Sequence, residues 1–155
     1  MRLLSVLICA VALSISPSVA TAQTGASAIA KLQFLTGTWR CVIQGGSSNG
    51  RAQHVSYSFS PNRQWMEERS WGASMSDWEV QMWGYDPNRQ LLTAYQFTGG
   101  GVATKSVGGW INGSFVAKRD DNGATVTLEP QGKRRINWVI RSADGSSTVR
   151  ELCAR

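Results

Sequence analysis

Turn signals recur along most of the chain at a nearly even spacing, and this rhythm most limits what the chain can fold into. Asn-Gly and Asp-Gly pairs favour tight hairpins, because both central residues of a type I′ turn need positive φ. Such breaks occur every roughly 9–13 residues, with no helical pattern between them to carry a parallel crossover. The sequence therefore predicts ten consecutive antiparallel strands, separated at 49–50, 61–62, 72–74, 86–88, 99–101, 112–113, 121–123, 131–132 and 144–145.

Apolar and polar residues alternate within several of these segments. Val55, Tyr57 and Phe59 are apolar, whereas the residues between them are polar. This period places a dry face and a wet face on each strand. A ten-strand meander has two exposed edges unless it closes, so we predict an all-β fold, a single antiparallel up-and-down β-barrel, with an open sandwich as the alternative.

The first 22 residues have the profile of a signal peptide. Arg2 precedes a short apolar run, and Ala20-Thr21-Ala22 forms an A-x-A cleavage site. A membrane anchor is the alternative, but the run is too short to span a bilayer comfortably. We predict an exported protein, either periplasmic or secreted, in which residues 1–22 are removed, 23–36 form a short segment with a helical turn, and 37–155 form the barrel.

Two cysteines remain once the leader and its Cys9 are removed. In an exported chain Cys41 and Cys153 predict one disulfide, which would join the first strand to the last as a closed barrel requires. Two separate buried thiols are the alternative.

The mature chain is moderately basic. Without Arg2, 15 Lys and Arg residues face 10 Asp and Glu residues, a net charge of +5. This charge suits anionic polymers, lipid head groups or nucleic acid, and it equally serves solubility. Export disfavours nucleic acid, and the one tight basic run, 133–135, follows a turn signal and is read as a solvated hairpin shoulder.

The start of the first strand carries a family resemblance. Gly37-Thr38-Trp39 resembles the G-x-W signature of calycin-like barrels, which include lipocalins, fatty-acid-binding proteins and nitrobindin-like proteins. Residues 34–39 together with 83–87 resemble the two best marked segments of an exported bacterial family of unknown function. The resemblance implies a barrel cavity closed near Trp39 and no established activity. It implies structural roles for Gly37, Trp39, Gly84, Asp86 and Pro87.

Two further features of these families find no match at the expected positions. Nitrobindin-like barrels hold haem through a late histidine, but His54 lies early and opposite the apolar face of its strand, so we expect it to face solvent. We predict no metal and no cofactor. In lipocalins a late arginine packs on the G-x-W tryptophan, and Arg150 would face away from Trp39 if Cys41 and Cys153 are bonded.

The segment 65–71 is the most chemically suggestive part of the chain. Alternation places Trp65, Glu67, Arg69 and Trp71 on one face and Met66, Glu68 and Ser70 on the other, so the barrel receives a carboxylate whichever face is inward. If the tryptophan face is inward, two indoles could hold a flat or cationic ligand. The alternative is an exterior face that forms a cross-strand ladder.

We predict a non-enzymatic barrel that binds a small apolar or aromatic molecule in its cavity. The lining candidates are Trp65, Glu67, Arg69, Trp71, Tyr95 and Phe97. The alternative is an envelope-associated interaction protein with a filled barrel, whose aromatic or basic outer surface meets an envelope polymer or a second copy of the chain. The sequence places no nucleophile, base and orienting group together, so catalysis is not expected.

Overall fold

A computed structural model describes residues 25–73 and 77–155 of the chain. The predicted signal peptide, residues 1–22, and its cleavage site lie outside the described residues. Among the described residues, no helix has both the length and the apolar character needed to cross a membrane.

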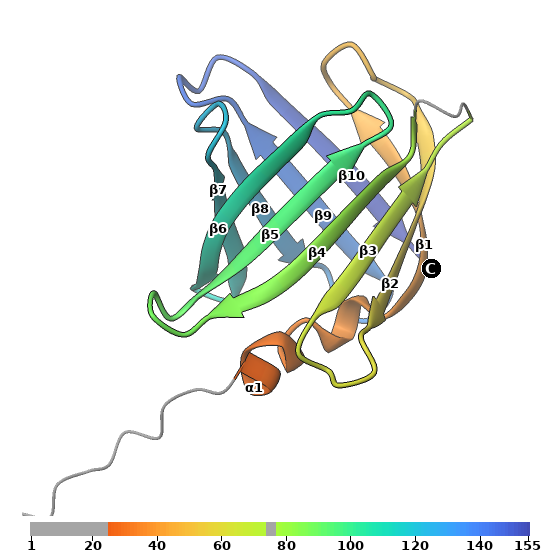
Figure 1. Cartoon of the computed structure of the whole chain (residues 1–155). Coiled ribbons are helices and arrows are strands. Elements are labelled where there is room, and N and C mark those ends of the chain that lie inside the picture. The colour runs from red at the N-terminus through yellow and green to blue at the C-terminus, as the bar shows by residue number, and fades with distance from the viewer. Residues whose placement is uncertain (1–24, 74–76) are drawn as a thin grey trace, which may run out of the picture.

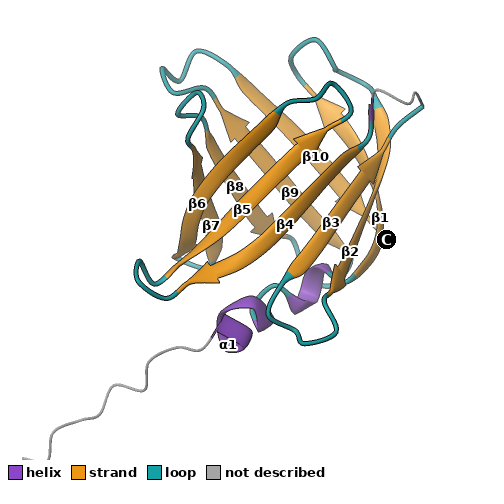
Figure 2. Ribbon diagram, in the orientation of Figure 1, coloured by secondary structure: helices purple, strands orange, loops and turns teal. Residues whose placement is uncertain are grey.

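Ten antiparallel strands form a closed barrel in which each strand pairs with its neighbour in sequence and β1 pairs with β10 (Figures 1 and 2). The predicted fold class is confirmed, and the nine predicted turn sites fall between consecutive strands. The strands are β1 (Gly37–Gln44), β2 (Ala52–Phe59), β3 (Met66–Trp71), β4 (Glu79–Asp86), β5 (Leu91–Thr98), β6 (Ala103–Ile111), β7 (Ser114–Arg119), β8 (Thr125–Pro130), β9 (Arg135–Arg141) and β10 (Thr148–Ala154).

The β6–β7 hairpin shows why turn residues marked the strand ends so clearly. Asn112 and Gly113 have φ of 49° and 82°, the two positive values that a type I′ turn requires. Gly37 begins β1 with φ of 113°, a backbone conformation that other residues rarely adopt. A glycine therefore has a conformational reason to open the G-x-W segment.

A short helix and a 3-10 turn cover one end of the barrel. Helix α1 (Gly25–Ala30) and turn η1 (Gln33–Leu35) lie across that end in Figure 2. Ile29, Leu32 and Leu35 are almost completely buried there, and burial of each such side chain contributes about 1.5–3 kcal/mol. The indole Nε1 of Trp39 donates a hydrogen bond to the Leu35 carbonyl at 2.6 Å, which ties the cover to β1.

Arg155 packs on the tryptophan of the G-x-W segment. Its guanidinium lies 4.3 Å from the centre of the Trp39 ring and donates to the carbonyl oxygens of Thr36 at 2.5 Å and Phe34 at 3.2 Å. The pairing of Arg40 with Ala154 explains this, because Arg155, the residue directly after β10, then follows on towards Trp39. Arg150 is exposed and pairs with Gln44, as the parity argument predicted.

The predicted disulfide is present between Cys41 and Cys153. These residues are directly opposite each other in the β1–β10 pair, with Cα atoms 4.0 Å apart, and both are buried. The bond links positions 112 residues apart in sequence, so it restricts the unfolded chain strongly.

Aromatic side chains fill the half of the barrel next to the helical cover. Trp83 packs edge-on against Phe115, with ring centres 5.1 Å apart, and stacks on Trp138 at 6.1 Å. Gly108 lets β6 and β7 approach closely at this level, since a Cβ atom there would lie 2.1 Å from the Val116 carbonyl oxygen. This half is therefore a packed core, and any ligand space lies beyond it.

An acidic chamber as the candidate functional site

The inward face of β3 is the one that carries Glu68. Met66, Glu68 and Ser70 are buried, and Glu68 pairs across the sheet with Gln81 of β4. Either Glu67 or Glu68 had to point into the barrel, and the structure shows that Glu68 does. Glu67 lies on the opposite face, where it forms an ion pair with Arg69.

The six predicted lining residues lie on the outer surface. The exposed fractions of the aromatic members are 42% for Trp65, 42% for Trp71, 44% for Tyr95 and 46% for Phe97. They do not line the cavity, because the face of β3 that carries Met66 and Glu68 is buried. On β5 it is Gln96, between Tyr95 and Phe97, that lines the cavity. Glu67, Met82 and Tyr95 stand side by side across β3, β4 and β5, as in the cross-strand ladder of the alternative interpretation.

The one histidine of the chain lies on the outer face of β2. His54 is exposed and stacks on Trp71, with ring centres 5.7 Å apart and planes inclined by 20°. It therefore cannot reach a ligand inside the barrel.

Residues 83–87, the second segment of the family resemblance, have local structural roles. Gly84 lies under the Trp65 ring, and a Cβ atom there would come within 2.2 Å of that ring. The carboxylate of Asp86 accepts hydrogen bonds from the backbone N–H groups of Asn88 at 2.9 Å and Arg89 at 3.2 Å. Pro87 follows in the same turn, so the segment shapes the β4–β5 hairpin.

A polar cavity occupies the half of the barrel away from the helical cover. The centre of a water molecule can reach about 70 Å³ of this cavity. The lining residues come from eight strands, β3 to β10: Glu68, Glu79, Gln81, Trp83, Gln96, Ser106, Arg119, Val126, Trp138, Ile140 and Glu151. We call this cavity the acidic chamber, because three of its side chains are glutamates.

Glu68 is the most strongly perturbed of the three glutamates. Burial, followed by repulsion from Glu79, raises its pKa to about 8. The indole N–H of Trp83 donates to its carboxylate at 3.1 Å and opposes part of that increase. Glu68 therefore exchanges a proton near neutral pH, far above the usual range of a carboxylic acid.

The other two glutamates are perturbed in the same direction. Burial raises the pKa of Glu151 to about 7, although Gln53 donates to its carboxylate at 2.5 Å. Burial also raises the pKa of Glu79, against the opposing effects of a hydrogen bond with Gln96 and the charge of Arg119. Carboxylates from β3, β4 and β10 thus share one poorly hydrated space.

Tyr57 lies next to this space and remains neutral. It is buried on β2 opposite Glu68, and its hydroxyl accepts a hydrogen bond from the Trp138 indole at 3.2 Å. Burial, followed by the charge of Glu68, raises its pKa well above the ordinary value. The phenol can exchange hydrogen bonds with the chamber without adding charge.

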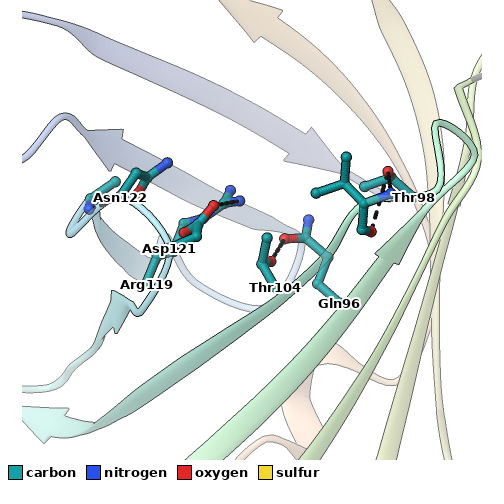
Figure 3. A network of polar contacts seen from close by, with 8 residues as sticks. Gln96, Thr98, Thr104, Arg119, Asp121 and Asn122 are labelled. Carbon is teal, nitrogen blue, oxygen red and sulfur yellow. Dashed lines mark hydrogen bonds and ion pairs between the residues drawn. The ribbon is translucent and has the colours of Figure 1, made fainter.

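Arg119 is the cation among the lining residues (Figure 3). Its guanidinium donates two hydrogen bonds to Asp121, at 3.1 and 3.0 Å, and Asp121 lies in the turn after β7. Gln96 accepts a hydrogen bond from Thr104 at 2.8 Å, which Figure 3 draws as a dashed line. Part of the positive charge of Arg119 is therefore balanced outside the trio of glutamates.

A group of potential metal-ligand atoms, all within 4.8 Å of one another, is formed in the described part of the chain by Cys41, Glu151 and Cys153. The two sulfur atoms are bonded to each other and supply no thiolate, the form that binds metals. The donor set does not fit a structural or catalytic zinc site.

Comparison with protein-family models gave no match for this chain, and comparison with curated proteins gave none either. The closed ten-strand antiparallel barrel is consistent with the calycin-like fold that the G-x-W segment predicted. This agreement concerns the architecture alone, and an architecture of this kind does not define a function.

Glu79 and Glu151 were not predicted as site residues. Glu151 lies two residues before Cys153, so the disulfide parity already placed it on the inward side of β10. Glu79 pairs with Ser70 at the start of β4, and no local pattern distinguished it from a solvent-facing carboxylate. Only the four strand pairings that link β10 to β4 through β1, β2 and β3 bring these side chains to one cavity.

Proposed function

We propose that the mature protein is an exported, non-enzymatic barrel that binds a small molecule in the acidic chamber. The observation that carries this proposal is the cavity itself, in which three glutamates face one space above an aromatic floor. Burial of carboxylates destabilises a protein unless they are paired. A purely structural interior would be better served by the apolar packing found in the other half of the barrel.

The polar lining refines the predicted ligand. The indole rings of Trp83 and Trp138 offer an aromatic surface, whereas Gln81, Gln96 and the glutamates offer hydrogen-bonding groups. A molecule with an aromatic or flat body and a polar end suits this lining better than a purely apolar molecule.

Export and family membership are part of the same proposal. The leader profile at residues 1–22 and the Cys41–Cys153 bond support a periplasmic or secreted protein, since disulfides persist in oxidising compartments. The G-x-W segment and the 83–87 segment, together with the barrel, support membership of the exported bacterial family that they resemble.

Native mass spectrometry of the mature protein, purified from its own exported fraction, tests the proposal. We expect a stoichiometric extra mass that is lost on unfolding, or binding of members of a panel of small cationic, neutral and anionic aromatic compounds. Absence of both the extra mass and any binding from the panel would refute a binding function for the chamber.

The outer aromatic surface supports a second candidate function, as an interaction protein. Trp65, Trp71, Tyr95 and Phe97 are each more than two-fifths exposed on β3, β5 and the segment before β3. Exposed aromatic clusters of this kind suit a flat polymer or a second copy of the chain. Light scattering at high protein concentration tests the homodimer: a monomer there, together with no retention on envelope polymers, would dismiss this candidate.

A further inference from the structure

We infer that the ligand of the acidic chamber is a small organic cation with an aromatic or flat apolar body. This inference rests on the proposed binding function and names the chemical class that the chamber selects.

The first support is the balance of charge around the cavity. Glu68, Glu79 and Glu151 come from three different strands, and Arg119 is the one cationic residue that lines the chamber in the described part of the chain. Two guanidinium hydrogen bonds of Arg119 go to Asp121. The three carboxylates would repel an anion that entered the chamber, whereas they would attract a cation.

The second support is the contrast between the chamber and the rest of the molecule. The whole chain carries a net charge of +6, yet its interior gathers carboxylates. A neutral ligand would displace water from these groups and favour their protonated forms, whereas a cation would supply the counter-charge that allows them to ionise.

The third support is the aromatic floor. Trp83 and Trp138 line the cavity, and their rings are stacked with planes inclined by 23°. Tryptophan is the aromatic side chain that stabilises a nearby cation best. Indole surface beside carboxylates therefore suits both parts of an aromatic amine.

Cation binding in this chamber is linked to proton release. The ionisable groups of the chamber are the three glutamates, Glu68 on β3, Glu79 on β4 and Glu151 on β10. The other ionisable side chains that face them are Tyr57 on β2 and Arg119 on β7. Because burial raises the pKa of Tyr57 well above its ordinary value, the phenol stays neutral near pH 7, and the glutamates are the groups that lose protons there. Because Glu68 and Glu151 are partly protonated near pH 7, a bound cation displaces protons from them, and affinity rises with pH.

The test uses three probes of similar shape on the full mature protein. Phenethylammonium is the cation, 2-phenylethanol the neutral analogue and phenylacetate the anion, each titrated by isothermal calorimetry at pH 6 and pH 8. We expect phenethylammonium to bind at least ten times more tightly than the other two at pH 8. Its affinity should be roughly fifty times weaker at pH 6, because the ionised fraction of a carboxyl group with a pKa of about 8 falls from about one half at pH 8 to about one hundredth at pH 6.

Neighbouring glutamates on opposite faces of β3 provide the matched variants. Glu68→Gln removes a chamber carboxylate, and Glu67→Gln removes an outer one of the same strand. A charge-assisted hydrogen bond contributes roughly ten- to a hundredfold in affinity. We therefore expect Glu68→Gln to weaken phenethylammonium binding by at least tenfold and Glu67→Gln to leave it unchanged.

The titrations distinguish selectivity for a cation from the ability of the chamber to bind a small molecule at all. Binding of 2-phenylethanol or phenylacetate as tightly as phenethylammonium would overturn the cation inference while leaving a binding chamber in place. Equal effects of the two glutamine variants would place the cation outside the chamber and also overturn it. No binding of the three probes or of the broader panel, with no extra mass on the native protein, would overturn both.

Discussion

Replacement of Glu68 by glutamine should stabilise the empty barrel, and the gain should depend on pH. Glu68 is only 8% exposed and its charged form is poorly compensated. Glutamine has nearly the same shape, and its amide oxygen can still accept the hydrogen bond from Trp83. The change therefore removes a titrating group with little change in packing.

The expected magnitude follows from the two pKa values. The ordinary pKa is 4.5 and the folded value about 8, so the folded protein binds more protons than the unfolded chain between these values. Stability that is present below pH 4.5 is thus lost as pH rises towards 8. Each pH unit in this range is worth about 1.4 kcal/mol, so the ionisable group destabilises the fold by about 3 kcal/mol at pH 7.

Urea unfolding followed by tryptophan fluorescence at pH 4.5, 6, 7 and 8 measures this effect. The free energy of unfolding of Glu68→Gln should be close to that of the wild type at pH 4.5 and exceed it by about 3 kcal/mol at pH 7. Glu67→Gln, which removes a carboxylate from the outer face of the same strand, is the matched control. A Glu68→Gln difference that stays constant from pH 4.5 to 8 would refute the reasoning.

Three further predictions concern the barrel. Reduction of the Cys41–Cys153 bond should lower the free energy of unfolding by about 2–4 kcal/mol, and an unchanged urea midpoint under reductant would contradict the role of the bond in restricting the unfolded chain. Gly108→Ala should cost about 3 kcal/mol because its Cβ meets backbone atoms, whereas Gly84→Ala meets an exposed ring that can move; equal losses in thermal unfolding would refute this distinction. Arg155→Lys should lose about 1–2 kcal/mol in urea unfolding, because an ammonium cannot make the same set of carbonyl hydrogen bonds while lying over the indole ring, and wild-type stability would contradict that account.

The sequence was most informative where the determinants are local. Positive φ at turns selects residues such as Asn112 and Gly113, so turn positions, strand number and hairpin order could be read directly. The disulfide was predicted from the expected export and from the positions of Cys41 and Cys153 in the first and last strands, and the structure confirms it. Apolar spacing also predicted the helical turn that buries Ile29, Leu32 and Leu35.

The alternation of side chains along a strand predicted the inward face only where one face was distinctly apolar. In β2 the face of Val55 and Tyr57 is buried as expected. In β3 each face carries a large apolar residue and a glutamate, so alternation separated Glu67 from Glu68 without saying which one enters the barrel. The aromatic residues chosen as lining candidates were attractive for their chemistry, but chemistry does not determine which way a strand faces.

The sequence by itself determined ten hairpin-connected strands and one inward carboxylate on the third strand, and it predicted the disulfide, because turn preferences and a period of two are properties of neighbouring residues. Closure of the barrel is a finding of the structure. Only the tertiary structure decided that Glu68, Glu79 and Glu151 share a chamber, and that Arg155 rather than an earlier arginine covers Trp39. Those arrangements depend on the registers between strands far apart in sequence and on how barrel closure directs each face, and a single strand carries no record of either.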